Sequence, residues 1–305
     1  MGRDGFTGYH PLVTMLYFVL VIGLTLCLSH PVCLALSLLC ALGYSLRLKG
    51  MRAVRFTVRY LLPLLIMTML INPVFSHQGT TTLAYLPSGN PLTLESIVYG
   101  VFAAFLLITV ITWFSCFNIV MTSDKLVYLF GRITPALSLV LSMALRFVPH
   151  FAAQAKVIAR AQRCMGRDVS NGGALRRARQ GIRILSILTT WALENAIETA
   201  DSMKSRGYGL AGRTAFSPYR LDGRDRKALL FLLLCGGILI MGIALGWLKF
   251  SYTPILGGAA FDGWQLGLFS LWLALCALPL VISVKEGAKW RTIHRAQARS
   301  LPSDT

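Results

Sequence analysis

Residues 96–123 read SIVYGVFAAFLLITVITWFSCFNIVMTS and contain no Asp, Glu, Lys or Arg. A helix needs about 20 predominantly apolar residues to cross the hydrocarbon core of a bilayer, so this stretch by itself predicts a transmembrane helix. Four further stretches of the chain also lack charged side chains, namely residues 5–46, 60–94, 228–248 and 263–284. We therefore predict an all-α polytopic membrane protein.

The composition agrees with a membrane protein and argues against an ordinary soluble enzyme. Of the 305 residues, 55% are hydrophobic and only 14% are charged, whereas soluble domains carry about 25% charged residues. The formal net charge is +18. In an apolar chain such an excess is typical of cytoplasmic loops between membrane spans. The seven cysteines form no C-x-x-C pair, which indicates no disulfide framework and no metal site.

Basic residues in the loops predict how the chain crosses the membrane. Six segments are apolar enough to span, approximately 11–28, 31–47, 60–76, 94–121, 228–248 and 263–284. The loop 47–59 holds five basic residues and no acid, which predicts a cytoplasmic position by the positive-inside rule. Both termini are then expected in the cytoplasm. The predicted divisions are four N-terminal spans in 1–121, a cytoplasmic region 122–227, a C-terminal transmembrane hairpin 228–284 and a cytoplasmic tail 285–305.

The region 122–227 holds 18 basic and 7 acidic residues, a net charge of +11, so we expect it to be cytoplasmic. Its apolar periodicity predicts two long helices. Pro135 is placed to open the first helix, and Pro149 predicts a kink or a break near Arg146. The helical pattern then resumes as far as Gly166. The second helix is predicted over 175–205, with Gly207 ending it.

The two predicted helices end in similar sequences, Met165-Gly166-Arg167 and Ser205-Arg206-Gly207. Each places a positive side chain beside a glycine. Two interpretations are open from these residues. The helices dock their basic ends on partner proteins, or they lie on anionic lipid with arginine side chains among the phosphates.

Three motifs in this region resemble those of the transmembrane T component of energy-coupling factor (ECF) transporters, a family that includes the cobalt-transport permease subunit. The motifs are Ala144-Leu145-Arg146-Phe147-Val148-Pro149, Ala161-Gln162-x-x-x-Gly166 and Met203-Lys204-Ser205-Arg206-Gly207-Tyr208. They are similar to the family's Arg-Phe-x-Pro segment and to its two Ala-Arg-Gly-type coupling motifs. Their order and their position between the membrane spans also match.

The resemblance implies a non-catalytic subunit of a prokaryotic plasma-membrane importer, with no cofactor and two long cytoplasmic coupling helices. It would couple two ATP-binding cassette ATPases to a membrane S component that binds a vitamin or a metal ion. The implied docking residues are Ser205, Arg206 and Gly207 on one helix and Met165, Gly166 and Arg167 on the other. Arg146, Pro149 and Pro135 would shape the coupling helix. The first motif departs from the family, because Met165 stands where arginine is typical. Either Met165 or Arg167 then fills the first docking site.

Other functions have less support in the residues. No G-x-x-x-x-G-K-[ST] sequence occurs, so ATP would bind to partner subunits. The five histidines are far apart, which argues against a metal site. A membrane-embedded lipid-modifying enzyme would need clustered carboxylates, for which Glu194, Glu198 and Asp201 are the only candidates. A nucleic-acid-binding role for the arginines of 176–183 lacks interleaved aromatic residues, so we expect no nucleic acid partner.

Overall fold

The computed structural model describes residues 5–75, 79–85, 91–167, 173–210, 219–252, 257–258 and 263–300. The chain divides into two compact units. The first unit comprises Met1–Thr122 and Tyr219–Thr305, and the second comprises Ser123–Pro218.

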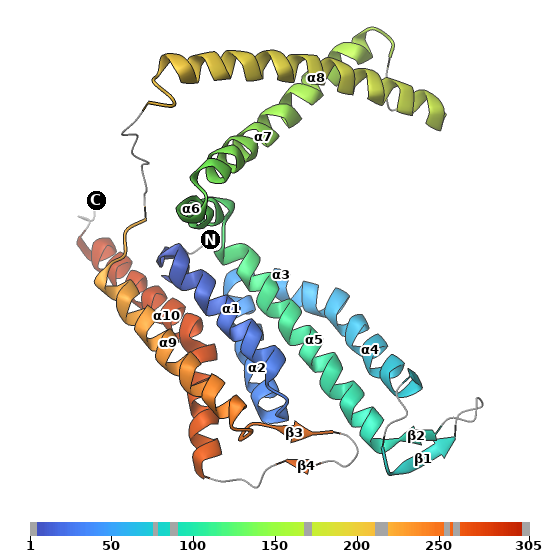
Figure 1. Cartoon of the computed structure of the whole chain (residues 1–305), viewed down its shortest axis with the longest axis vertical. Coiled ribbons are helices and arrows are strands. Elements are labelled where there is room, and N and C mark those ends of the chain that lie inside the picture. Colours follow the sequence, from blue (N-terminus) through green and yellow to red (C-terminus); the bar gives the residue numbers. More distant parts are fainter. Residues whose placement is uncertain are drawn as a thin grey trace. The chain divides into compact units, whose positions relative to one another are not determined.

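The first unit is a helical bundle with two short hairpins at one end (Figure 1). Its described helices are a 3-10 turn Gly5–Gly8, α1 (Pro11–Cys27), α2 (Pro31–Lys49), α3 (Met51–Phe56), a π-helical turn Thr57–Leu61, α4 (Leu62–Phe75), α5 (Leu94–Val120), α9 (Gly223–Ala244) and α10 (Gly263–Ser300). The hairpins pair β1 (Thr82–Tyr85) with β2 (Pro91–Thr93) and β3 (Phe250–Ser251) with β4 (Gly257–Gly258), both antiparallel. In the first hairpin Thr82 lies opposite Thr93, with an irregularity before Ala84.

The starts of α1 and α2 follow one local rule. Each helix opens with a proline, which loses no hydrogen bond in the first turn. In each case the preceding histidine accepts a backbone N–H through Nδ1. His10 accepts from Leu12 at 3.2 Å and His30 from Val32 at 3.3 Å. The side chain of Thr93 caps α5 in the same way.

Aromatic residues fill the core of the first unit. Tyr17 and Phe18 of α1 pack edge-on against Trp113 of α5, with ring centroids 6.1 and 6.3 Å apart. The two fully buried indoles have acceptors for their N–H groups. Trp113 donates to Ser37 Oγ at 3.0 Å, and Trp272 donates to the Cys33 carbonyl at 2.9 Å. These bonds offset the cost of burying a polar group in an apolar core.

Within the part of the chain that the structure describes, six helical segments are long and apolar enough to cross a membrane: Pro31–Lys49, Met51–Phe75, Leu94–Val120, Leu137–Cys164, Gly223–Ala244 and Gly263–Lys289. Five of them overlap predicted spans, and two of these five, Pro31–Lys49 and Gly263–Lys289, contain the whole predicted span. α1 corresponds to the sixth predicted span, but at 17 residues it counts only as a shorter apolar helix. Length and composition alone therefore select Leu137–Cys164 in its place. That segment includes four basic residues and belongs to the second unit, whereas α1 is uncharged and packs in the core of the bundle. We therefore keep α1 as a span. The all-α polytopic membrane fold is confirmed.

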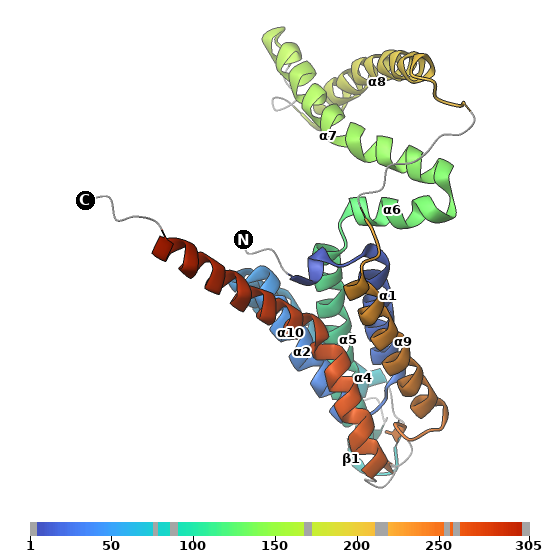
Figure 2. The same cartoon turned by 90° about the vertical axis from the view of Figure 1, so that its left-hand side faces the viewer.

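The second unit contains α6 (Ser123–Ile133), α7 (Pro135–Cys164) and α8 (Ala174–Ser205). α7 packs against both neighbours, and α8 crosses it (Figure 2). Near the crossing, the rings of His150 and Phe151 lie 5.1 and 5.7 Å from Trp191. On the other side, Ser138 donates a hydrogen bond to the Val127 carbonyl of α6 at 3.2 Å.

α7 begins at Pro135, as predicted, but it is not broken at Pro149. The helix continues through this proline to Cys164. A proline removes one intrahelical hydrogen bond, here to Leu145, and crowds the preceding turn. The flanking turns hold the helix together, since Phe147 stacks on Phe151 at 5.7 Å and Phe151 packs on Trp191. The second predicted helix is confirmed with its start one residue earlier, at Ala174.

Candidate functional site

The C-terminal end of α7 forms a Schellman cap, in which two N–H groups beyond the helix turn back onto its last carbonyls. Met165 is the C-cap, and Gly166 follows with φ 72°. The Gly166 N–H donates to the Arg163 carbonyl at 3.0 Å, and the Arg167 N–H donates to the Gln162 carbonyl at 3.0 Å. This pattern defines the motif and explains the glycine, because a positive φ strains residues that carry a Cβ.

The end of α8 has the same cap. Arg206 is the C-cap, and Gly207 follows with φ 77°. The Gly207 N–H donates to the Lys204 carbonyl at 3.0 Å, and the Tyr208 N–H donates to the Met203 carbonyl at 3.0 Å. Ser205, the last helical residue, donates through its hydroxyl to the Ser202 carbonyl at 2.9 Å.

The two caps can be aligned residue by residue. The C-cap dihedrals are φ −86°, ψ 16° at Met165 and φ −85°, ψ 11° at Arg206. Met165 is therefore the structural equivalent of Arg206, and Arg167 is the equivalent of Tyr208. We call residues 162–167 the α7 tip and residues 203–208 the α8 tip. The sequence alone did not decide which residue corresponds to Arg206.

At both tips, the side chains that follow the last helical turn are exposed and can contact a partner. Met165 is 57% exposed and Tyr208 is 44% exposed. The side chains of Arg167 and Arg206 are also exposed, and no salt bridge within the described residues involves either of them. Exposed side chains on a fixed backbone turn are suited to docking.

The tips lie apart, at opposite sides of the crossed helices α7 and α8 (Figures 1 and 2). The other predicted site residues are not gathered at either tip. Arg146 and Pro149 are exposed in the middle of α7, close to the contact between His150 and Trp191. Pro135 is the first residue of α7.

Apolar side chains on the second unit remain uncovered. The most exposed ones on α8 are Leu175, Ile182, Leu185, Leu193 and Ile197, each at least 60% exposed. α7 adds Leu137, Val140, Val148 and Val157, each at least 55% exposed. Apolar surface of this extent marks an interaction site with protein or membrane.

Helix α6 also belongs to this unit and was not predicted from the sequence.

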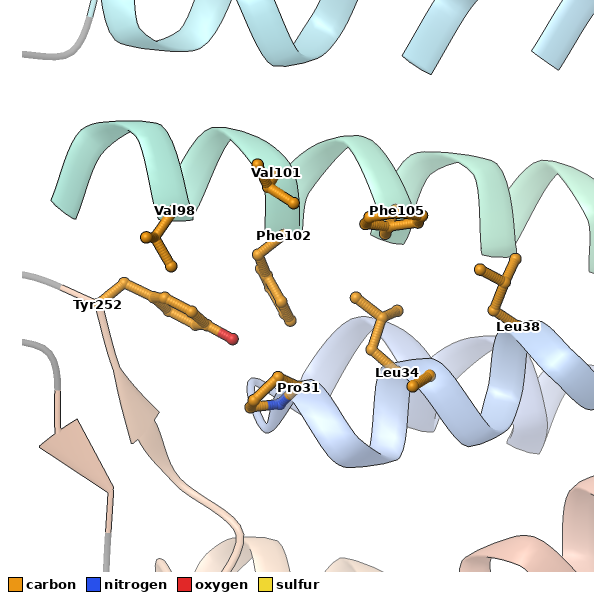
Figure 3. Close-up of a pocket in the computed structure, with 9 residues that line it drawn as sticks. Pro31, Leu34, Leu38, Val98, Val101, Phe102, Phe105 and Tyr252 are labelled. Carbon is orange, nitrogen blue, oxygen red and sulfur yellow. The ribbon is translucent and has the colours of Figure 1, made fainter. Parts of the chain in front are cut away.

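The described residues offer little support for catalysis. Glu194, Glu198 and Asp201 are all exposed on α8, so they do not form the enclosed acidic site that a lipid-modifying enzyme would need. A cavity of about 240 Å³ lies between α2 and α5 (Figure 3). Its walls are aliphatic and aromatic except for the Tyr252 hydroxyl, which donates to the Ser29 carbonyl at 2.9 Å. Burial raises the pKa of Tyr252, so this group stays a neutral donor.

An apolar helical bundle, together with a second unit of two long helices with matched, exposed caps, defines a polytopic membrane protein. The chain belongs to the cobalt transport protein family CbiQ, whose profile matches residues 8–216. The family resemblance expected from the motifs is therefore confirmed.

Similar proteins carry the name energy-coupling factor transporter transmembrane protein EcfT. The protein from Lactobacillus helveticus is 39% identical over 106 residues, covering 34% of this chain and 38% of that protein. The protein from Exiguobacterium sibiricum is 35% identical over 108 residues, covering 35% of this chain and 41% of that protein. The chain thus spans about two fifths of these two relatives. EcfT 1 from Listeria monocytogenes is 27% identical over 198 residues, covering 60% of this chain and 73% of that protein.

Proposed function

We propose that this chain is the transmembrane T component of an energy-coupling factor importer. It would couple two cytoplasmic ATP-binding cassette ATPases to a membrane S component that binds a vitamin or a metal ion. Both termini would lie in the cytoplasm of a prokaryotic cell. The observation that carries the proposal is the pair of identically capped, exposed helix ends within the region that matches the family.

Arg206 would make the principal contact at the α8 tip. The Schellman cap fixes its backbone, so its side chain leaves the helix end from a defined position. A charge-assisted bond to a carboxylate on an ATPase would then form, and the planar guanidinium supports two parallel hydrogen bonds. Gly207 turns the chain away without a side chain, which lets the partner's backbone approach closely. Ser205 lies on the last turn beside this contact.

Residues Met165, Gly166 and Arg167 would dock the second ATPase in the same manner. ATP-driven closure of the ATPase dimer would draw the two tips together. The crossing of α7 and α8 at Phe151 and Trp191 would carry this motion to the exposed apolar residues of both helices. We propose that these residues contact the S component, with Arg146, Pro149 and Pro135 shaping α7 between the tip and that surface.

The test is co-purification of the tagged full-length chain from its native membrane in mild detergent. Wild type, Arg206→Glu and a control, Lys204→Glu, would be compared. Lys204 is exposed on the last turn of the same helix and undergoes the same charge change, but it contributes only its backbone carbonyl to the cap and lies two residues before the C-cap Arg206. We expect two ATPase chains with wild type and the control, and a loss of at least tenfold with Arg206→Glu. Absence of ATPases from all three samples, with other membrane complexes intact, would count against a T component.

A further inference from the structure

We propose that a groove between α9 and α10 holds one acyl chain of an anionic phospholipid, with the phosphate of that lipid beside Lys249. The groove belongs to the first unit and involves neither the α7 tip nor the α8 tip. The inference goes beyond the proposed function and does not depend on it, because it requires only that α9 and α10 lie in a membrane.

The groove lies on the surface of the bundle, where α9 and α10 run side by side (Figures 1 and 2). It has a volume of about 490 Å³. Its walls come from both helices and are almost entirely apolar. The lining residues Ile238, Met241, Leu245 and Trp264 are each more than half exposed. Both helices are long and apolar enough to span a membrane, so an open groove on their surface is in contact with hydrocarbon.

Two glycines keep the groove open. Gly237 and Gly267 both line it, and an added Cβ at either position would meet no atom within 4 Å. Side chains of the described residues therefore leave the space beside these glycines unfilled. An apolar void loses dispersion contacts on one side of its walls, whereas a flexible acyl chain fills an irregular space and restores those contacts.

The length of the groove favours an acyl chain over a transmembrane helix as its occupant. On α10 the lining residues run from Trp264 to Leu271. At 1.5 Å per residue this side is about 10 Å long. The hydrocarbon of one leaflet is about 15 Å thick, half of the bilayer core. The groove thus lies within one leaflet, whereas a helix of a partner protein would need a contact surface that extends across both.

The end of the groove beside Trp247 has the aromatic residues of a membrane–water interface. A Schellman cap ends α9, because the Gly246 N–H donates to the Ile243 carbonyl at 3.0 Å. The Trp247 N–H donates to the Gly242 carbonyl at 3.1 Å in the same cap. Trp247 then stacks with Trp264 of α10, with ring centroids 6.4 Å apart. Tryptophan is enriched at the level of lipid headgroups, so this pair marks the headgroup end of the groove.

Lys249 supplies the positive charge that a phosphate needs at this end. It follows Trp247 by two residues, its N–H donates to the Gly246 carbonyl at 3.2 Å, and its side chain is exposed. It is the only charged residue in the described part of the connection between α9 and α10, and no salt bridge among the described residues involves it. A lysine at the membrane surface attracts anionic headgroups, and its long side chain can extend toward them. We therefore expect phosphatidylglycerol to bind better than a zwitterionic lipid.

The test uses the full-length chain in phosphatidylcholine vesicles that contain increasing fractions of phosphatidylglycerol brominated in its acyl chains. Bromine quenches tryptophan fluorescence on contact, and the signal of Trp264 is the difference between each protein and its Trp264→Phe counterpart. We expect wild type to be quenched more strongly than random contact with the brominated lipid predicts. Gly267→Leu, which fills the groove, should reduce quenching to the random level. Leu273→Phe, at an exposed position of α10 outside the groove, should leave quenching unchanged.

The same assay tests the headgroup contact. Lys249→Ala should raise the fraction of brominated lipid needed for half-maximal quenching about fivefold, since one lysine near anionic lipid contributes on that scale. The control is Lys289→Ala, which removes an exposed lysine farther along α10 and should have no effect. Equal effects of the two substitutions would overturn the assignment of the phosphate to Lys249.

Equal quenching of wild type and Gly267→Leu at every lipid fraction would overturn the inference. Weaker quenching of wild type than of Gly267→Leu would also overturn it, because protein rather than lipid would then cover Trp264. Failure of the chain to retain ATPases would instead contradict the proposed function and leave the lipid site intact. Thermal unfolding of each variant in detergent verifies that the substitutions leave the fold unchanged.

Discussion

Gly166→Ala tests whether the caps depend on the left-handed glycine. Gly166 has φ 72°, and an added Cβ would meet no atom within 4 Å. The substitution therefore changes only the backbone preference. A residue with a Cβ pays about 1–2 kcal/mol to adopt this conformation. Because 1.4 kcal/mol corresponds to a factor of ten, we expect the cap to open about 5 to 30 times more often.

Hydrogen exchange at the Arg167 amide measures this opening, because its N–H is bonded to the Gln162 carbonyl in the cap. Gly166→Asn is the first control, since asparagine tolerates a positive φ better than alanine. Gly181→Ala is the second. Gly181 lies inside α8 with open space around it, so alanine should stabilise that helix by about 0.5–1 kcal/mol. Unchanged Arg167 exchange in Gly166→Ala would refute the conformational argument for both tips.

Three further predictions concern the first unit. Burial lowers the pKa of His30, so the unfolded chain binds more protons just below the ordinary value of about 6.5. The thermal midpoint in detergent should therefore fall as the pH drops from 7.5 to 5.5, and His30→Asn, which keeps a cap acceptor, should reduce that dependence. Gly100→Leu should destabilise the protein by about 1–3 kcal/mol, because a Cβ at this position would already lie 3.3 Å from the Met69 carbonyl oxygen of α4. The control is Gly237→Leu, which lies in open space on α9 and should leave the stability unchanged. Arg224→Ala removes a partly exposed ion pair with Glu286 at 3.5 Å and a cation–π contact with Tyr9 at 4.2 Å. We therefore expect faster proteolysis near residue 8, whereas the protein should lose less than about 1 kcal/mol of stability.

Hydrophobic runs predicted most of the bundle because the membrane requires long apolar segments. They did not predict where each helix ends. α10 continues from the last predicted span, which ends at residue 284, to Ser300, although charged residues begin at Lys285. Charge stops the apolar run, but lysine and arginine are good helix formers, so the backbone hydrogen bonds continue. Hydropathy therefore predicts which segment can lie in the hydrocarbon core, but it does not predict where the helix ends.

Short elements were missed for a related reason. α6 has 11 residues, too few for a span, and includes Gly131, which weakens its helical pattern. Gly131 is useful in the fold, since a Cβ there would lie 2.7 Å from Ser138 Oγ of α7. The β1–β2 hairpin lies in an uncharged loop whose strands have only four and three residues. Pairing between such short strands depends on tertiary context that periodicity does not contain.

The sequence predicted where the candidate site lies, but it did not predict which residues of the two tips correspond to each other. The glycines at 166 and 207 indicated helix ends, and the structure places a positive φ at both. Sequence alone left Met165 and Arg167 as alternatives, because each is adjacent to Gly166. Only the cap hydrogen bonds identify Met165 as the equivalent of Arg206. Docking by these residues remains a prediction.

The two long helices differ in mechanical character. α8 has 32 residues, no proline and one glycine, so it forms a lever about 48 Å long. A rotation of about 10° would displace its far end by about 8 Å, given the rise of 1.5 Å per residue. α7 has Pro149 at its middle, where one backbone hydrogen bond is missing, so the helix bends more easily at this point. Equal forces on the two tips would therefore swing α8 as a rigid arm but bend α7.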